Sequence, residues 1–107
     1  MHDPLIPTTS APGDRARFRQ LAERWRRDTE FCSSLTEIVL HPAYQQIIGM
    51  GRAAIPLILE ELQREPDHWF WAVTAITGED PVSPIARGHV PAMTDAWLTW
   101  ARENGWL

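Results

Sequence analysis

Apolar residues recur along this chain at the three- and four-residue spacing of amphipathic helices. The first such stripe predicts a helix over residues 14–28, with Asp14 as its N-cap. The apolar residues of the stripe are Phe18, Leu21, Ala22 and Trp25. Their i, i+3, i+4, i+7 spacing places them on one face, which we expect to be buried.

Prolines and glycines divide the rest of the chain into shorter segments. Ser34 opens a Ser-Leu-Thr-Glu capping box that predicts a short helix to Leu40. Pro42, which suits a first helical position, starts a second short helix that ends near Ile48. Three further helices are predicted over residues 52–64, 68–77 and 90–104.

Local signals define the ends of these later helices. Asp67 is the expected N-cap of the helix over residues 68–77, and Gly78 suits the position after its last residue. Pro56 must lie in the first turn of its helix, or the helix must bend there. Gly105 ends the last helix, and residues 79–89 form a loop.

No segment alternates apolar and polar residues with the period of a strand, so the fold class is all-α. We predict a small bundle of about five helices in a single domain over residues 14–107. Residues 1–13, with three prolines, are predicted to form a flexible arm.

Residues 48–78 resemble one unit of a HEAT-like helical repeat. The resemblance rests on Gly51-Arg52-Ala53-Ala54-Ile55-Pro56-Leu57-Ile58-Leu59 and Leu62, then Asp67, Ala72, Ala75 and Ile76-Thr77-Gly78. The string Ala96-Trp97-Leu98-Thr99-Trp100 is similar to the closing helix of some bacterial HEAT-like proteins. The resemblance implies a helical hairpin and a protein-binding surface. Only one unit is present, whereas solenoids stack several.

The composition is that of an ordinary globular protein, with 44% hydrophobic and 22% charged residues. The apolar run of residues 55–59 is far too short to span a bilayer. The first residues lack the pattern of a secretory signal, and Cys32 is the only cysteine. These features predict a cytoplasmic protein.

The formal net charge is −4, and all ten basic residues are arginines. Six arginines lie in the first thirty residues, and Arg15, Arg19 and Arg26 line one edge of the first apolar stripe. Three interpretations stay open for them: side chains that are solvated or paired within the chain, an acidic protein partner, or nucleic acid.

Three consecutive aromatic residues, Trp69, Phe70 and Trp71, cover about 200° of a helix. If Trp69 faces the core, Trp71 points away from it. Either the last helix or the C-terminal residues cover Trp71, or Trp71 belongs to an interface with a partner.

Candidates for chemistry are weak. Cys32 and His41 could form a nucleophile–base pair only if the fold brought them together. Glu60 and Glu61 are expected on a solvated helix face, away from the apolar one. No histidine or cysteine spacing indicates a metal site or a cofactor. In the polar string of residues 41–46, Tyr44 and Gln45 offer groups that can recognise a partner.

We therefore predict a non-catalytic protein-interaction module, such as an antitoxin, an immunity factor or an accessory subunit. Phe70 and Trp71 are the expected apolar anchors. The expected charge partners are Arg19 and Arg26, and the expected polar contacts are Tyr44 and Gln45. The alternative is a nucleic-acid-binding accessory protein that uses the arginine-rich first helix. A homo-oligomer also stays open, and no membrane partner is expected.

Overall fold

The computed structural model describes residues 12–107, and every regular element in that range is helical. In chain order the elements are α1 (Pro12–Thr29), α2 (Leu35–Leu40), α3 (Pro42–Gly49), the 3-10 helix η1 (Gly51–Ala54), α4 (Ile55–Arg64), α5 (Phe70–Thr77) and α6 (Val90–Glu103). The all-α prediction is confirmed. The predicted arm falls largely on residues 1–11, outside the described residues, but Pro12 and Gly13 belong to α1.

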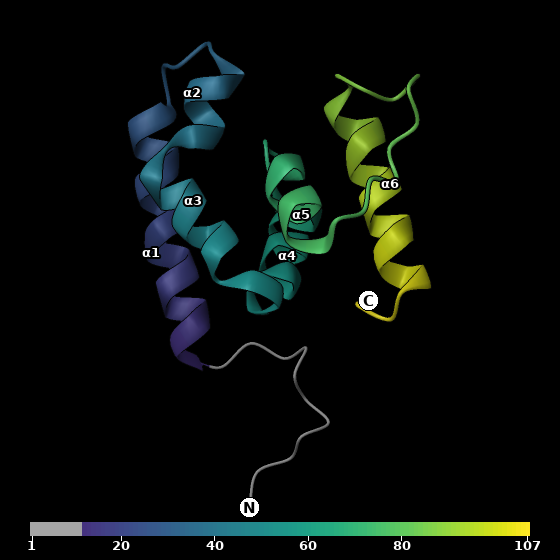
Figure 1. Ribbon diagram of the computed structural model, residues 1–107, viewed down its shortest axis with the longest axis horizontal. Helices are drawn as coiled ribbons and strands as arrows, with labels where there is room; N and C mark the ends of the chain where they lie inside the picture. Colours follow the sequence, from purple (N-terminus) through teal and green to yellow (C-terminus); the bar gives the residue numbers. More distant parts are fainter. Residues whose placement is uncertain (1–11) are drawn as a thin grey trace, which may run out of the picture.

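The helices are arranged around a central pair (Figure 1). α1 packs along α3 on one side of the molecule, α4 and α5 occupy the middle, and α6 packs against α4 on the other side. The α1–α2 turn and the loop that precedes α6 both lie at the same end, at the top of the view.

The core is built around three tryptophans, Trp25, Trp69 and Trp97, all of which are buried. Trp69 lies 4.7 Å from Trp25 and 5.4 Å from Phe18 between ring centroids. Trp25 also donates a hydrogen bond from Nε1 to the carbonyl oxygen of Ile38 over 2.8 Å. Because aromatic rings in this distance range attract one another, the ring contacts hold α1 against the start of α5, and the Trp25 hydrogen bond joins α1 to α2.

Several predicted helix ends are confirmed. Ser34 caps α2 by accepting a hydrogen bond from the Glu37 N–H, and Pro42 occupies the first turn of α3. The left-handed conformation at Gly78, with φ of 73°, ends α5. Glycine suits this position because a side chain with a Cβ atom is strained there.

Two predicted N-caps are wrong. Asp14 lies inside the first turn of α1, which begins two residues earlier. Asp67 does not cap α5: its carboxylate accepts from the neighbouring His68 N–H over 2.7 Å, and α5 begins only at Phe70. The prediction that Pro56 lies in the first turn of its helix is confirmed, although the predicted helix over residues 52–64 is not one element. It splits into η1 and α4, so that Pro56 lies in the first turn of α4.

The α4–α5 hairpin matches the position of the HEAT-like unit, although membership of that repeat class stays a prediction. None of the helices between residues 12 and 107 is long and apolar enough to cross a membrane.

Candidate functional site

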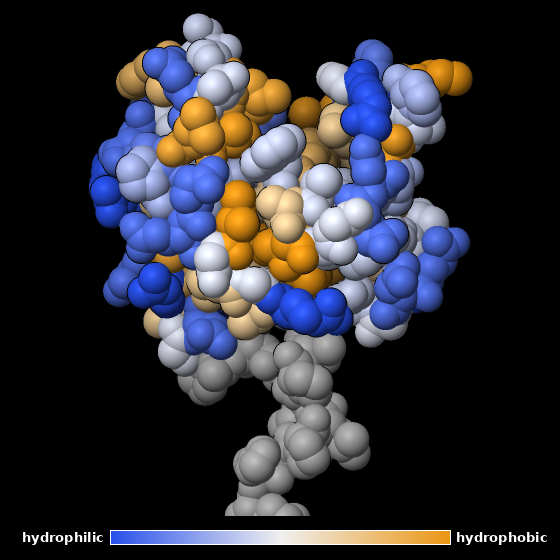
Figure 2. Space-filling view, viewed as in Figure 1, coloured by the Kyte–Doolittle hydropathy of each residue, from blue (hydrophilic) through white to orange (hydrophobic). Residues whose placement is uncertain are grey.

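An apolar groove opens at the end of the molecule between α2 and α6. Its apolar lining residues are Leu35, Val39, Phe70, Trp71, Val82, Val90, Met93 and Trp97. Its polar lining residues are His68, Thr74, Asp80 and Arg87. Figure 2 shows the molecule hollowed at this end, with hydrophobic residues on both sides of the notch.

Trp71 is the large aromatic residue that this groove leaves exposed. Its side chain is 57% exposed, whereas Trp69, two positions earlier, is 0% exposed. Neither α6 nor the C-terminal residues cover Trp71. Trp106 packs instead against the Arg52 guanidinium, which lies 5.1 Å from its ring centroid. The alternative in which Trp71 is buried within the chain is therefore wrong.

Other exposed apolar residues belong to segments at this end of the molecule. Leu35 in α2 is also exposed, and the two most exposed large apolar residues, Phe31 at 93% and Ile85 at 90%, belong to the two connections at this end. Isolated apolar residues are common on protein surfaces, but a group of them beside an apolar groove is typical of an interaction site.

The loop of the groove is held by an ion pair. Arg87 donates to the Asp80 carboxylate over 2.6 Å, and the Val82 N–H donates to the same side chain over 3.3 Å. The hydrogen bond from Arg87 is the main cause of the lowered pKa of Asp80. Asp80 therefore stays charged and helps to fix the loop that carries Val82 into the groove.

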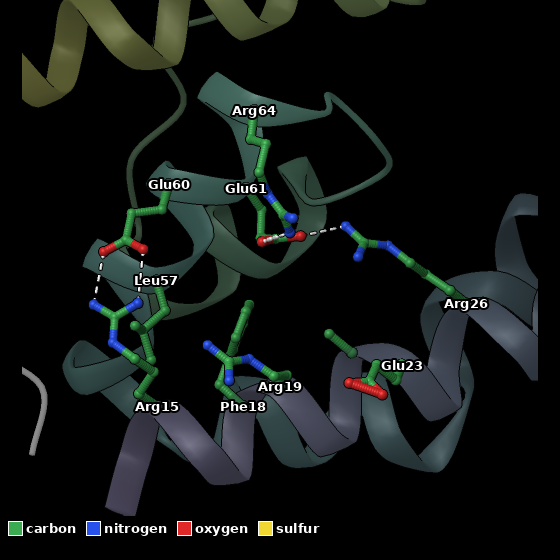
Figure 3. A pocket seen from close by; sticks show the side chains of 10 residues that line it. Arg15, Phe18, Arg19, Glu23, Arg26, Leu57, Glu60, Glu61 and Arg64 are labelled. Atoms are coloured by element: carbon green, nitrogen blue, oxygen red, sulfur yellow. Dashed lines mark hydrogen bonds and ion pairs between the residues drawn. The ribbon is translucent and has the colours of Figure 1, made fainter. Parts of the chain in front are cut away.

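A second, charged groove lies between α1 and α4. Its lining residues are Arg15, Phe18, Arg19, Ala22, Glu23, Arg26, Leu57, Glu60, Glu61 and Arg64 (Figure 3). Arg15 binds Glu60 through two hydrogen bonds of 2.8 and 2.9 Å. This bidentate contact lowers the pKa of Glu60.

The prediction that Glu61 lies on a solvated helix face is wrong. Glu61 is 9% exposed, and its carboxylate accepts hydrogen bonds from both Arg26 and Arg64. Burial by itself would raise the pKa of Glu61, but the two arginine contacts outweigh burial and lower it. Glu61 is therefore a fixed negative charge that links α1 to α4.

The predicted charge partners have different surroundings. Arg26 pairs with Glu61 and its guanidinium lies 5.7 Å from the ring centroid of Trp69, so for this residue the structure shows the ion pair within the chain. Arg19 lines the charged groove and has no ion pair or hydrogen bond from its side chain within residues 12–107. Figure 3 shows it between the two bridged pairs, without a contact to either.

The two residues predicted as polar contacts, Tyr44 and Gln45, differ in their exposure. Tyr44 is fully buried, and its hydroxyl bonds to the backbone of His68 and Ala72, so the prediction that it contacts a partner is wrong. Gln45 is exposed and donates from Nε2 to the Val39 carbonyl over 2.8 Å. Gln45 thus fixes the end of α2 beside the apolar groove, although it does not line that groove.

His41 does not activate Cys32. Its Nε2 lies 2.9 Å from the Asp28 carboxylate, and its Nδ1 accepts from the Ala43 N–H over 3.0 Å. Both ring nitrogens are therefore engaged, and the ring acts as the N-cap of α3. Across the described part of the chain, no three histidine, cysteine or acidic side chains gather as metal ligands.

Four of the six predicted site residues line two grooves that share no lining residue, whereas Tyr44 and Gln45 line neither. Phe70 and Trp71 lie in the apolar groove, and Arg19 and Arg26 lie in the charged groove. Sequence reasoning missed Leu35 and Val82 as groove residues. Leu35 is an apolar residue at the first position of a very short helix, and this was a signal that could have indicated a groove residue. Val82 lies in a proline-containing loop without periodicity, so the sequence offered no signal for it.

Comparison with known proteins gives no relative: no family model, no curated protein and no solved structure matches this chain.

Proposed function

We propose that this protein is a non-catalytic protein-interaction module whose apolar groove binds apolar side chains of a partner protein. The observation that carries the proposal is the exposure of Trp71 beside the groove formed by α2, α5 and α6. This role fits an antitoxin, an immunity factor or an accessory subunit that acts in the bacterial cytoplasm.

The energetics of Trp71 support this role. Burying a large apolar side chain contributes about 1.5–3 kcal/mol, and most of that contribution is not realised in the isolated chain. A partner that covers Trp71 would realise it. Tryptophan is also among the residues on which binding energy concentrates at interfaces.

The surroundings of Trp71 favour an anchor rather than a scattered surface residue. Phe70, which is itself buried, lines the same groove, and Arg87 donates a hydrogen bond to Asp80 within the loop that supplies Val82. A wall fixed in advance lowers the entropy that binding must overcome.

The nucleic-acid alternative receives less support. Arg15 and Arg26 contact glutamates of α4, and Arg24 and Arg27 each lie within 4 Å of Asp28. Phosphate binding requires accessible positive charge gathered on one face. Pairing within the chain therefore leaves α1 with few arginines for a phosphate backbone.

The decisive experiment compares two exposed apolar residues. The full chain is first purified from the native host together with its stoichiometric partner. The affinity of the chain for this purified partner is then measured by calorimetry. We expect Trp71→Ala to weaken binding at least about tenfold. Leu40→Ala is the control, because Leu40 is similarly exposed but does not line the groove.

Equal effects of the two substitutions, or no effect of Trp71→Ala, would contradict the proposal. Sedimentation of the isolated chain is the second measurement. A dimer that dissociates in the Trp71→Ala variant would assign the groove to a second copy of the chain and not to a different protein.

A further inference from the structure

The charged groove contains an arginine that the chain leaves without a partner. Four arginines and three glutamates line the groove. Arg15 is occupied by Glu60, and Arg26 and Arg64 share Glu61. Arg19 has no such contact within residues 12–107.

The neighbouring carboxylates are not positioned to neutralise Arg19. Glu60 would lose two hydrogen bonds to Arg15 if it moved, and Glu61 is buried between two other guanidinium groups. Glu23 lies one helical turn from Arg19, but no ion pair joins the two side chains within residues 12–107, and Figure 3 draws them without a contact. The net charge of the lining side chains is thus positive by one unit, in a chain of net charge −4.

The floor of the groove is apolar. Phe18, Ala22 and Leu57 lie at its base, and all three side chains are buried among the helices. A ligand that reaches Arg19 therefore meets a planar cation with five donors beside apolar surface. Guanidinium groups bind carboxylates through two parallel hydrogen bonds, and this geometry is specific for planar anions.

From this geometry we propose that Arg19 binds a single carboxylate of an acidic peptide segment, in which the aspartate or glutamate stands next to an apolar residue. The carboxylate bonds to the Arg19 guanidinium, and the apolar neighbour lies on the floor formed by Phe18 and Leu57. One negative charge matches the net charge of the lining. A chain of phosphates would instead bring further negative charges against Glu23, Glu60 and Glu61. This site lies outside the apolar groove, and it does not rest on the function proposed for that groove.

The test uses the full chain and a peptide blocked at both ends, N-acetyl-Leu-Glu-Leu-amide. Binding is followed by NMR through the side-chain Nε–H signals of the arginines and the backbone signals of Phe18 and Leu57. We expect saturable shifts at Arg19, Phe18 and Leu57 that weaken as salt is added. The same peptide with glutamine in place of glutamate should give no saturable shift.

Two matched variants decide the assignment. Arg19→Gln should weaken peptide binding about tenfold or more, since it removes a charge-assisted contact. Arg17→Gln makes the same change of charge on the same helix, and Arg17 does not line the groove, so binding should be retained. Because Arg19 has no contact to lose, its variant should remain folded.

Three outcomes would overturn the proposal. They are an absence of saturable shifts, equal weakening in the Arg17 and Arg19 variants, and inorganic phosphate binding at Arg19 more tightly than the peptide. Trp71→Ala serves as a further control. It should leave peptide binding unchanged, so that a failure here is distinct from a failure of the apolar groove.

Discussion

The hydroxyl of Tyr44 in α3 accepts a hydrogen bond of 2.9 Å from the backbone N–H of Ala72, in the first turn of α5. The same hydroxyl donates to the His68 carbonyl over 2.9 Å. The N–H groups of a first helical turn have no partner within the helix. A tyrosine from another helix thus supplies the cap that Asp67 does not, and it holds the start of α5, where Phe70 and Trp71 enter the apolar groove.

Removing this hydroxyl should destabilise the protein. Tyr44→Phe keeps the ring but leaves a buried N–H and a carbonyl without their partner, which costs about 1–3 kcal/mol in the free energy of unfolding. Urea unfolding followed by circular dichroism measures the change. A loss smaller than about 0.5 kcal/mol would show that the hydroxyl does not cap α5 in solution.

The same residue predicts a loss of stability at alkaline pH. Burial raises the pKa of Tyr44 above its ordinary value near 10, although the hydrogen bond from Ala72 opposes that shift. The unfolded chain loses the proton first, so the contribution of Tyr44 to stability is constant below pH of about 10 and falls as pH rises further. Since Tyr44 is the only tyrosine, tyrosinate absorbance reports on it alone. Ionisation should coincide with unfolding, and a native protein that ionises near pH 10 would contradict this account.

Glu61 and Glu60 should differ in their effects on stability. Glu61→Gln disrupts a buried contact with two arginines and should cost about 1.5–3 kcal/mol. Glu60→Gln disrupts an exposed pair, so its cost should stay within about 1 kcal/mol. Urea unfolding at neutral pH compares them.

The pH dependence gives an independent check on Glu61. Its pKa is lowered in the folded chain, so its contribution is present above the unfolded value and is lost as pH falls through the folded value. In the Glu61→Gln variant this part of the acid destabilisation should disappear. An unchanged acid profile would mean that Arg26 and Arg64 do not hold the carboxylate in solution.

Trp69 and Trp71 form a matched pair for separating core from surface. Trp69→Ala removes a buried ring that contacts Phe18 and Trp25, and it should cost about 3–5 kcal/mol. Trp71→Ala removes an exposed ring and should change the unfolding free energy by less than about 1 kcal/mol. Thermal unfolding of both variants measures the difference, and similar losses would place Trp71 in the core.

Gly49 and Gly78 should respond to alanine in opposite directions. A Cβ atom at either position meets no atom within 4 Å, so the backbone conformation decides the result. Gly78 has φ of 73°, and Gly78→Ala should cost about 1–2 kcal/mol. Gly49 lies in α3 without a positive φ, and Gly49→Ala should stabilise by about 0.5–1 kcal/mol. Calorimetry measures the melting temperatures of the two variants. If both substitutions shift the melting temperature in the same direction, this account is contradicted.

The sequence alone determined the helical class and many of the helix ends. These features depend on neighbours within one or two turns: the Ser34 cap, the Pro42 start and the left-handed Gly78 each follow from local backbone chemistry. The opposite directions of Trp69 and Trp71 follow in the same way, because positions two apart on a helix point about 200° apart.

Only the tertiary structure decided which charges and polar groups meet. Arg15 and Glu60 are 45 positions apart, and Tyr44 and Ala72 are 28 apart. Helical periodicity gives the face on which a residue lies, but not the neighbouring helix that packs there or its register. For that reason the pattern placed Glu61 in solvent, although packing buries it. Packing likewise left Arg19 as the arginine of the charged groove without a partner among the described residues.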